Sequence, residues 1–222
     1  MATHLDLEEQ EQIAELKHFW QRWGNLLTWL LIAVLGAYAA WTAWQAWSNR
    51  QAAQAAVLYD TVERAAALGD VALLERSAGD IEDKFSGTTY AHQSALLAAR
   101  VLFDKGNVAA ARKQLQWVIE RGSDDAYIAL ARLRLAALLI QENALDEARQ
   151  TLSGKVPADF EPLLADRLGD IDMLQNKPQE AAAHYQKAWS GMQANNDYRR
   201  LVAVKLAALG KDPEELPAAE KK

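Results

Sequence analysis

Histidines and carboxylates are the residues of this chain whose side chains could do chemistry. The histidines stand at positions 4, 18, 92 and 184. No two of them have the spacing of three or four residues with which one helix chelates zinc. The carboxylates form two groups, Asp166 with Asp170 and, earlier, Asp80 with Glu82 and Asp83. Paired carboxylates one helical turn apart, such as Asp166 and Asp170, are typical of general acid and base catalysis.

Neither carboxylate group has the companions that catalysis requires. The sequence contains no HExxH, GxSxG, P-loop or GxGxxG motif, and no nucleophile, base or metal ligand converges on either group. We therefore expect both groups to form solvated acidic surfaces, and we expect no catalytic, cofactor-binding or metal-binding residue. The absence of cysteine excludes disulfides, zinc fingers and a cysteine nucleophile.

Charge and composition exclude further classes of protein. The 222 residues include 24 Lys and Arg against 30 Asp and Glu, a net charge of -6, so the chain lacks the positive field that holds nucleic acid. Half of the residues are hydrophobic but only 8% are aromatic, and the apolar content consists mostly of the helix formers Ala and Leu. We predict an all-α protein with no nucleic-acid partner.

The longest uncharged stretch covers the 27 residues from Trp23 to Asn49, and about 20 apolar residues suffice to cross a bilayer. Tryptophan, which prefers the membrane interface, gathers at both ends of the stretch. These residues are Trp20, Trp23, Trp41, Trp44 and Trp47. From Trp23 to Trp44 a helix rises about 31 Å, which is close to the thickness of the hydrocarbon core of a bilayer. We predict one transmembrane helix over residues 23–49, with the five tryptophans as membrane-interface anchors.

A cleaved signal peptide is the alternative interpretation, because Ala37-Tyr38-Ala39 has the small-x-small form of a cleavage site. Two features favour an uncleaved anchor instead. The charged residues ahead of the apolar stretch are mainly acidic, five Asp and Glu against Lys17 and Arg22, whereas a signal peptide begins with a short basic segment. The uncharged stretch also continues for ten residues beyond Ala39.

Positive charge beside the span gives a weak indication of orientation. Lys17 and Arg22 precede it and Arg50 alone follows it closely, which favours a cytoplasmic N-terminus. Residues 1–22 are then a cytoplasmic segment. Their apolar side chains recur every three or four residues, so they form either an amphipathic helix on the membrane surface or a continuation of the membrane helix.

Residues 50–210 contain a repeated pattern of helix pairs, in which the first helix ends at Gly or Asn. Small residues, which let two antiparallel helices pack closely, recur at intervals of twelve. They are Ala99 and Ala111, Ala136 and Ala148, and Gly169 and Ala181. The second members of these pairs lie 37 and 33 residues apart, close to the period of about 34 in tetratricopeptide repeats. The pattern predicts a tetratricopeptide-like helical-repeat solenoid.

The first helix of each pair lines the concave groove in such solenoids. The register of the repeats places seven residues on that face: Arg100, Phe103, Leu133, Ile140, Asp166, Asp170 and Met173. Their mixed apolar and charged character suits extended or helical peptide segments. A final helix over residues 197–209 is predicted to form a polar cap, and residues 211–222 are expected to be a disordered tail.

The arrangement of the whole chain is similar to that of a known family. An acidic start and the stretch Gln12-Ile13-Ala14-Glu15-Leu16-Lys17-His18-Phe19-Trp20 lead through Gly24 and Asn25 into one membrane helix, and a degenerate repeat domain follows. This layout resembles the YfgM-type ancillary subunits of the bacterial SecYEG translocon. The resemblance implies a single-pass inner-membrane protein with a cytoplasmic N-terminus and a periplasmic tetratricopeptide-like domain over residues 50–210.

The resemblance also implies partners and a function. The partners are the SecYEG translocon, a membrane-anchored chaperone of the PpiD type, periplasmic chaperones and unfolded client polypeptides. The function is that of a non-catalytic adaptor that helps to pass translocated polypeptides to periplasmic chaperones. The alternative is a repeat scaffold, membrane-anchored or released by a signal peptidase, for the assembly or regulation of another envelope complex. An enzyme is a distant third hypothesis.

Overall fold

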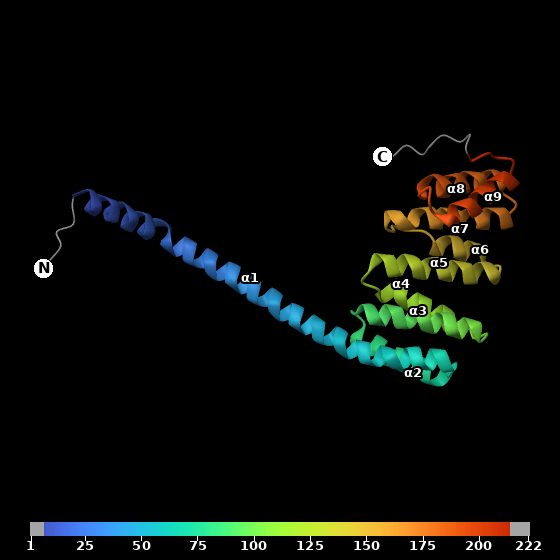
Figure 1. Ribbon diagram of the computed structural model, residues 1–222, viewed down its shortest axis with the longest axis horizontal. Coiled ribbons are helices and arrows are strands. Elements are labelled where there is room, and N and C mark those ends of the chain that lie inside the picture. Colours follow the sequence, from blue (N-terminus) through green and yellow to red (C-terminus); the bar gives the residue numbers. More distant parts are fainter. Residues whose placement is uncertain (1–6, 214–222) are drawn as a thin grey trace. The chain divides into compact units, whose positions relative to one another are not determined.

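The computed structural model describes residues 7–213, and within this range every regular element is a helix (Figure 1). The helices in chain order are α1 (Leu7–Leu68), α2 (Val71–Phe85), α3 (Thr89–Asp104), α4 (Val108–Arg121), α5 (Asp125–Gln141), α6 (Leu145–Thr151), the short 3-10 helix η1 (Ala158–Phe160), α7 (Glu161–Leu174), α8 (Pro178–Gly191) and α9 (Asp197–Ala208). This confirms the predicted all-α class. Residues 1–6 of the predicted cytoplasmic segment and residues 214–222 of the predicted disordered tail lie outside the described range.

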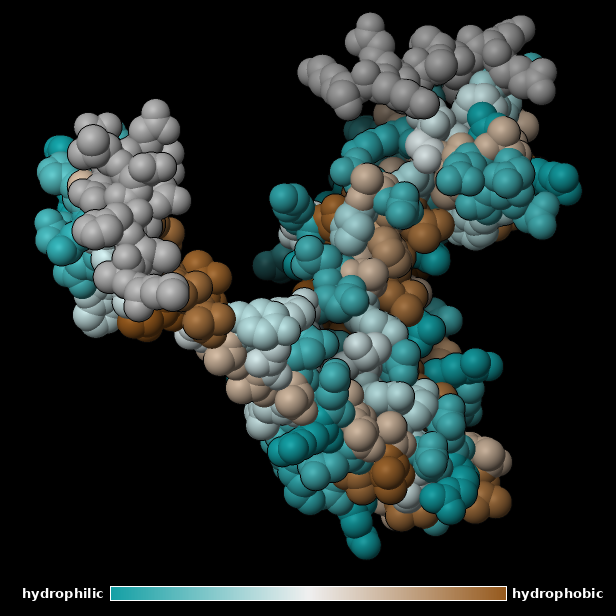
Figure 2. All heavy atoms as spheres, turned by 60° about the vertical axis from the view of Figure 1, so that its left-hand side comes forward, coloured by the Kyte–Doolittle hydropathy of each residue, from teal (hydrophilic) through white to brown (hydrophobic). Residues whose placement is uncertain are grey.

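The chain divides into two compact units, residues 1–51 and 52–222. In the first unit α1 begins at Leu7 and continues through the predicted span without a break. Its apolar side chains are exposed, and it is long and apolar enough to cross a membrane. Figure 2 shows brown and pale residues along this arm, with hydrophilic residues before them. A continuous apolar surface of this kind is stable in a lipid environment and not in water.

The second unit is a series of antiparallel helix pairs. Residues 52–68 of α1 begin it, because Ala55, Val62 and Ala65 are fully buried there. Each later helix packs on its neighbour in the chain, and α5 also packs on α7. Three groups of buried side chains follow one another along this unit, and each group combines residues of neighbouring helices. This is the nearest-neighbour packing that a solenoid requires.

Four of the turns between paired helices, and the end of α9, share one geometry. Gly69, Gly106, Asn143, Asn176 and Gly210 all have a left-handed backbone with φ between 57° and 80°. After each of them the next N–H donates to a carbonyl in the last turn of the helix, at 2.8–3.1 Å. This Schellman arrangement satisfies carbonyls that the helix end leaves free, and it needs Gly or Asn at the left-handed position. The Gly and Asn turns of the sequence pattern are therefore helix stops.

The small residues at intervals of twelve lie where helices meet. Ala99, Ala111, Ala136, Ala148 and Ala181 are at most 3% exposed. The remaining member of the set is Gly169 of α7. A Cβ atom at this position would stand 2.5 Å from the ring of Tyr185, a residue of α8. The predicted role of these residues in close packing is confirmed.

Glu82 in α2 gives the unit a pH-dependent stability. Burial raises the pKa of Glu82 to about 7, and Asp83 adds to the rise, while Gln114 and Lys113 oppose it. In the unfolded chain this carboxyl ionises near its ordinary pKa of 4.5. The contribution of Glu82 to the free energy of unfolding is therefore fully present below pH 4.5, and it is lost as the pH rises to about 7.

We expect Glu82→Gln to stabilise the protein by about 1–2 kcal/mol at pH 8, a value reduced to allow for the partial exposure of the side chain. The gain over wild type should shrink as the pH falls towards 4.5. Urea unfolding at several pH values measures the difference between the two proteins. Burial also lowers the pKa of His92, which makes its contribution to stability rise with pH. His92 is present in both proteins, so its contribution cancels and the difference between them isolates Glu82. A gain that does not vary with pH would contradict the assignment.

Candidate binding groove

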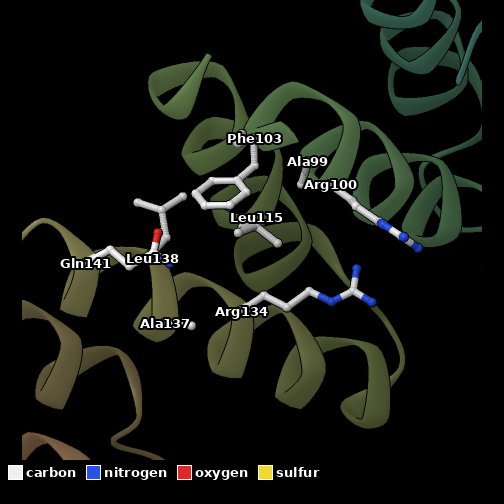
Figure 3. A pocket seen from close by; sticks show the side chains of 9 residues that line it. Ala99, Arg100, Phe103, Leu115, Arg134, Ala137, Leu138 and Gln141 are labelled. Atoms are coloured by element: carbon white, nitrogen blue, oxygen red, sulfur yellow. The ribbon is translucent and has the colours of Figure 1, made fainter. Parts of the chain in front are cut away.

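A hollow of about 400 Å³ opens between α3, α4 and α5 (Figure 3). Its lining residues are Ala99, Arg100 and Phe103 from α3, Ala111 and Leu115 from α4, and Arg134, Ala137, Leu138 and Gln141 from α5. The α5 residues have the spacing of one helix face, with i, i+3, i+4 and i+7. The small side chains of Ala99, Ala111 and Ala137 leave the space that the larger ones surround. The volume is within the range of sites that hold ligands.

The two ends of the hollow differ in chemistry. Figure 3 shows the ring of Phe103 beside Leu138 at one end, and the side chains of Arg100 and Arg134 directed towards the other. Phe103 is 38% exposed, a large exposed fraction for an aromatic residue beside a buried core. Both a positive charge and an apolar surface are thus presented within one opening.

The two arginines are weakly engaged by the rest of the protein. Arg134 donates to the backbone carbonyl of Leu96 at 3.2 Å. Partial burial, and then the positive charge of Arg100, lower the pKa of Arg134, and both side chains line the same hollow. Arg100 pairs with Asp104 at 3.9 Å, and both of these side chains are more than 60% exposed. A pair this long and this exposed contributes little.

The remaining predicted groove residues of α5 lie elsewhere. Leu133 and Ile140 are half-buried and pack on the central core cluster, which includes Leu164 and Ile171 of α7. The structure thus brings Arg100 and Phe103 together in the hollow and places Leu133 and Ile140 outside its lining.

The α7 residues of the predicted face meet α9. Asp166 is 1% exposed and accepts hydrogen bonds from Tyr198 and Lys205, both at 2.7 Å. Asp170 accepts from Lys205 at 2.6 Å and from Tyr185 at 2.8 Å. The expected solvated surface is wrong for this carboxylate group, because two tyrosines and a lysine cover it. Met173, at the end of the same helix, remains 41% exposed.

The predicted polar cap differs from α9 as it is folded. Lys205 turns inward to the α7 carboxylates, and Arg199 lies 3.9 Å over the ring of Trp189. The outward side of α9 includes Leu201 and Val204, at 47% and 65% exposure, as well as the exposed charges of Asp197 and Arg200. The buried charge of Asp166 explains the arrangement, because a buried carboxylate needs a cation beside it.

A second network joins α6, α7 and α8 through Asp172, which is 2% exposed. Its carboxylate pairs with Arg149 of α6 and lies 2.5 Å from Nδ1 of His184 on α8. In the other predicted carboxylate group, Asp80 pairs with Lys84 at 2.8 Å on the surface of α2. Among residues 13–213 no three His, Asp or Glu side chains form a group that could hold a metal ion. His4 lies outside the described residues.

The five predicted interface tryptophans are all exposed on α1, at fractions between 46% and 62%. The first of them covers Gly24, where a Cβ atom would stand 3.1 Å from its indole ring. Thr28 donates to the carbonyl of Gly24 at 2.7 Å, which satisfies a hydroxyl within the apolar stretch. The side chains of this stretch are therefore compatible with lipid.

The sequence pattern did not select the α5 residues that line the hollow, which are Arg134, Ala137, Leu138 and Gln141. With the 37-residue offset between Ala99 and Ala136, position 137 corresponds to position 100. The opposite wall of the hollow is formed by the first helix of the next repeat. The residues of that helix which face the preceding repeat lie three positions before position 137 or one position after it, at Arg134 and Leu138. The signal in the sequence that could have identified the hollow was the pair Arg100 and Arg134, one in the first helix of each of two successive repeats.

The chain thus combines a helical-repeat domain, which has an open hollow between α3 and α5, with an apolar N-terminal helix long enough to cross a membrane. Residues 17–211 match the family model described as a tetratricopeptide repeat-like domain. An ancillary SecYEG translocon subunit of Neisseria gonorrhoeae is 34% identical over 210 residues, which are 94% of this chain and 100% of that protein. One of Haemophilus influenzae is 26% identical over 182 residues, 82% of this chain and 89% of that protein.

The chain therefore belongs to the tetratricopeptide repeat-like family and, within it, to the YfgM-like ancillary SecYEG translocon subunits.

Proposed function

We propose that this protein is a single-pass inner-membrane subunit that accompanies the SecYEG translocon and acts as a non-catalytic adaptor. The carrying observation is that the similarity to the neisserial subunit extends over 94% of this chain and the whole of that relative. It thus includes the apolar helix as well as the repeat domain. A shared anchor and a shared domain support a shared site of action.

The anchor is the α1 stretch over residues 23–49, with its N-terminal end in the cytoplasm and the repeat domain in the periplasm. Exposed apolar side chains along the helix support insertion. The five exposed tryptophans, three of them close together at the far end, support a boundary at each end of the span. Lys17 and Arg22 ahead of the span support the orientation.

The repeat domain binds emerging polypeptides and helps to pass them to periplasmic chaperones, including a membrane-anchored chaperone of the PpiD type. The hollow between α3 and α5 is the binding surface that supports this role, because it is open, partly apolar and charged at one end. Binding at such a surface is expected to be weak. An anchor beside the channel compensates, since tethering raises the effective concentration of the client.

Purification of the full-length protein from membranes in mild detergent tests the proposal. We expect translocon subunits to co-purify, and a membrane-anchored chaperone with them, while the bait keeps its full intact mass. Recovery of a different envelope complex alone would favour the scaffold alternative and overturn the proposal. A bait shortened by 39 residues would show signal-peptide cleavage and remove the anchor.

Deletion of residues 1–49 provides a second arm of the same experiment. The buried side chains of residues 52–68 remain in this variant, so we expect its helices to melt at the temperature of the wild-type repeat domain. Recruitment to the translocon should be lost, because the tether is gone. Undiminished co-purification of a folded variant would show that the anchor does not direct the interaction.

A further inference from the structure

The hollow between α3 and α5 is chemically asymmetric, and this asymmetry indicates what it binds. One end presents the aromatic ring of Phe103 with Leu115 and Leu138, and the other end presents the guanidinium groups of Arg100 and Arg134 (Figure 3). Gln141 is the remaining polar lining residue, and no carboxylate belongs to the lining. The positive charge at this opening is therefore not neutralised from within the hollow.

The arginine donors have capacity for an external acceptor. Each guanidinium has five N–H donors. Arg134 uses one of them on the carbonyl of Leu96, and the pair between Arg100 and Asp104 is long and exposed. Two neighbouring cations also repel each other, which is the second cause of the lowered pKa of Arg134. A bound carboxylate would relieve this repulsion and form charge-assisted hydrogen bonds.

The size and spacing of the two ends limit the ligand. A hollow of about 400 Å³ accommodates one or two large apolar side chains and not a folded domain. Arg100 and Phe103 are three residues apart on α3, and Arg134 and Leu138 are four apart on α5, so the backbone positions that carry the two ends are separated by about one helical turn, roughly 5 Å. Side chains two apart in an extended peptide, or four apart in a helix, have a similar separation of about 5–7 Å.

We propose that this hollow selects polypeptide segments in which a large apolar side chain and a carboxylate lie on the same side, two residues apart in an extended segment or four apart in a helix. The apolar side chain inserts beside Phe103 and Leu138, and the carboxylate binds Arg100 and Arg134. This specificity rests on the proposed function, since it names the kind of client segment that the adaptor binds.

The corresponding face of the last repeat supports the assignment to this hollow. There the α7 carboxylates Asp166 and Asp170 are bound by Lys205 and Tyr198 of α9. That position is occupied by the chain itself, with its charges paired. The α3 and α5 face carries charge of the opposite sign, which is paired only by the long, exposed contact between Arg100 and Asp104. It also has an open apolar surface, so of the two faces it is the one that the chain leaves unoccupied.

Fluorescence polarisation with the full-length protein in detergent micelles tests the proposal. The probes are labelled nonapeptides of the form Ser-Gly-Ser-Phe-Ser-X-Ser-Gly-Ser, in which X is Asp, Asn or Lys, together with a peptide that has Ser in place of Phe and Asp at X. We expect the peptide with Phe and Asp to bind tightest, with an affinity about fivefold to tenfold above that of the Asn peptide. The Lys peptide should bind more weakly still.

Two variants separate the two ends of the hollow. The double variant Arg100→Gln with Arg134→Gln should reduce the preference for Asp over Asn to less than about twofold, while the preference for Phe over Ser persists. Phe103→Ala should weaken the preference for Phe and leave the preference for Asp. Arg200→Gln is the matched control, because Arg200 is an exposed arginine of α9 and should change neither preference.

Equal affinities for the Asp and Asn peptides, an unchanged Asp preference in the double variant, or binding of none of the probes would each overturn this proposal. None of these results bears on recruitment by the translocon, which co-purification measures separately. Loss of co-purification with an intact Asp preference would instead count against the proposed function and leave the specificity of the hollow standing.

Discussion

Replacement of Lys205 by methionine is expected to lower the free energy of unfolding by about 3–5 kcal/mol. Nζ of Lys205 lies 2.7 Å from a carboxylate oxygen of Asp166 and 2.6 Å from one of Asp170. Asp166 is 1% exposed, so the substitution leaves a buried negative charge without a cation. Methionine has nearly the length of the lysine stem, which keeps the packing similar and isolates the loss of charge.

Urea unfolding followed by circular dichroism measures this effect. Arg200→Gln on the same helix is the control, because Arg200 and Asp197 pair at 3.5 Å with both side chains more than 85% exposed, and its effect should be below about 0.5 kcal/mol. Adding Asp166→Asn to the methionine variant should recover part of the loss, since it removes the uncompensated charge. If Lys205→Met were as stable as the control Arg200→Gln, solvent would have to reach the α7 carboxylates, and the prediction would be wrong.

Replacement of Gly169 by alanine is expected to destabilise the protein by about 1–3 kcal/mol through overpacking. The new Cβ atom would stand 2.5 Å from Cε1 and 2.6 Å from Cδ1 of Tyr185. The ring has little freedom to move away, since it is 3% exposed, its hydroxyl donates to Asp170, and Lys205 lies 5.1 Å above its centre. Either the ring or the helix must shift.

Gly79→Ala in α2 is the matched control for this prediction. A Cβ atom on Gly79 has no neighbour within 4 Å, so only the helix propensity of the two residues differs. Alanine is favoured over glycine within a helix by about 0.5–1 kcal/mol, and this variant should be stabilised by that amount. The same substitution thus has opposite signs at the two positions. A stabilised Gly169→Ala variant would show that α7 and α8 can separate without cost.

These two predictions concern the part of the solenoid that is closed. Around α7 the carboxylates, tyrosines and Lys205 bind one another, which fixes α9 to the last repeat. Between α3 and α5 the corresponding face is open and positively charged at one end.

The class and the repeat architecture of this protein could be predicted from the amino-acid sequence. Gly and Asn at the helix ends, such as Gly106 and Asn143, predicted the turns because few other residues adopt a left-handed backbone at low cost. The intervals between Ala99, Ala111 and their equivalents predicted the helix pairs, because close helix packing needs a small residue at the contact. The length of the uncharged stretch predicted an exposed apolar helix. All of these are local signals.

The side of each helix that is left free follows from the packing of the helices and could not be predicted from the pattern. The pattern selected Leu133 and Ile140 on α5, whereas Arg134 and Leu138 line the hollow. Neighbouring residues of a helix differ in direction by about 100°, so an apolar periodicity identifies the buried half without saying which neighbour each flank meets. In the same way Asp166 and Lys205, 39 positions apart, become a buried pair only because α9 folds back on α7. Periodicity within a helix contains no information about that contact.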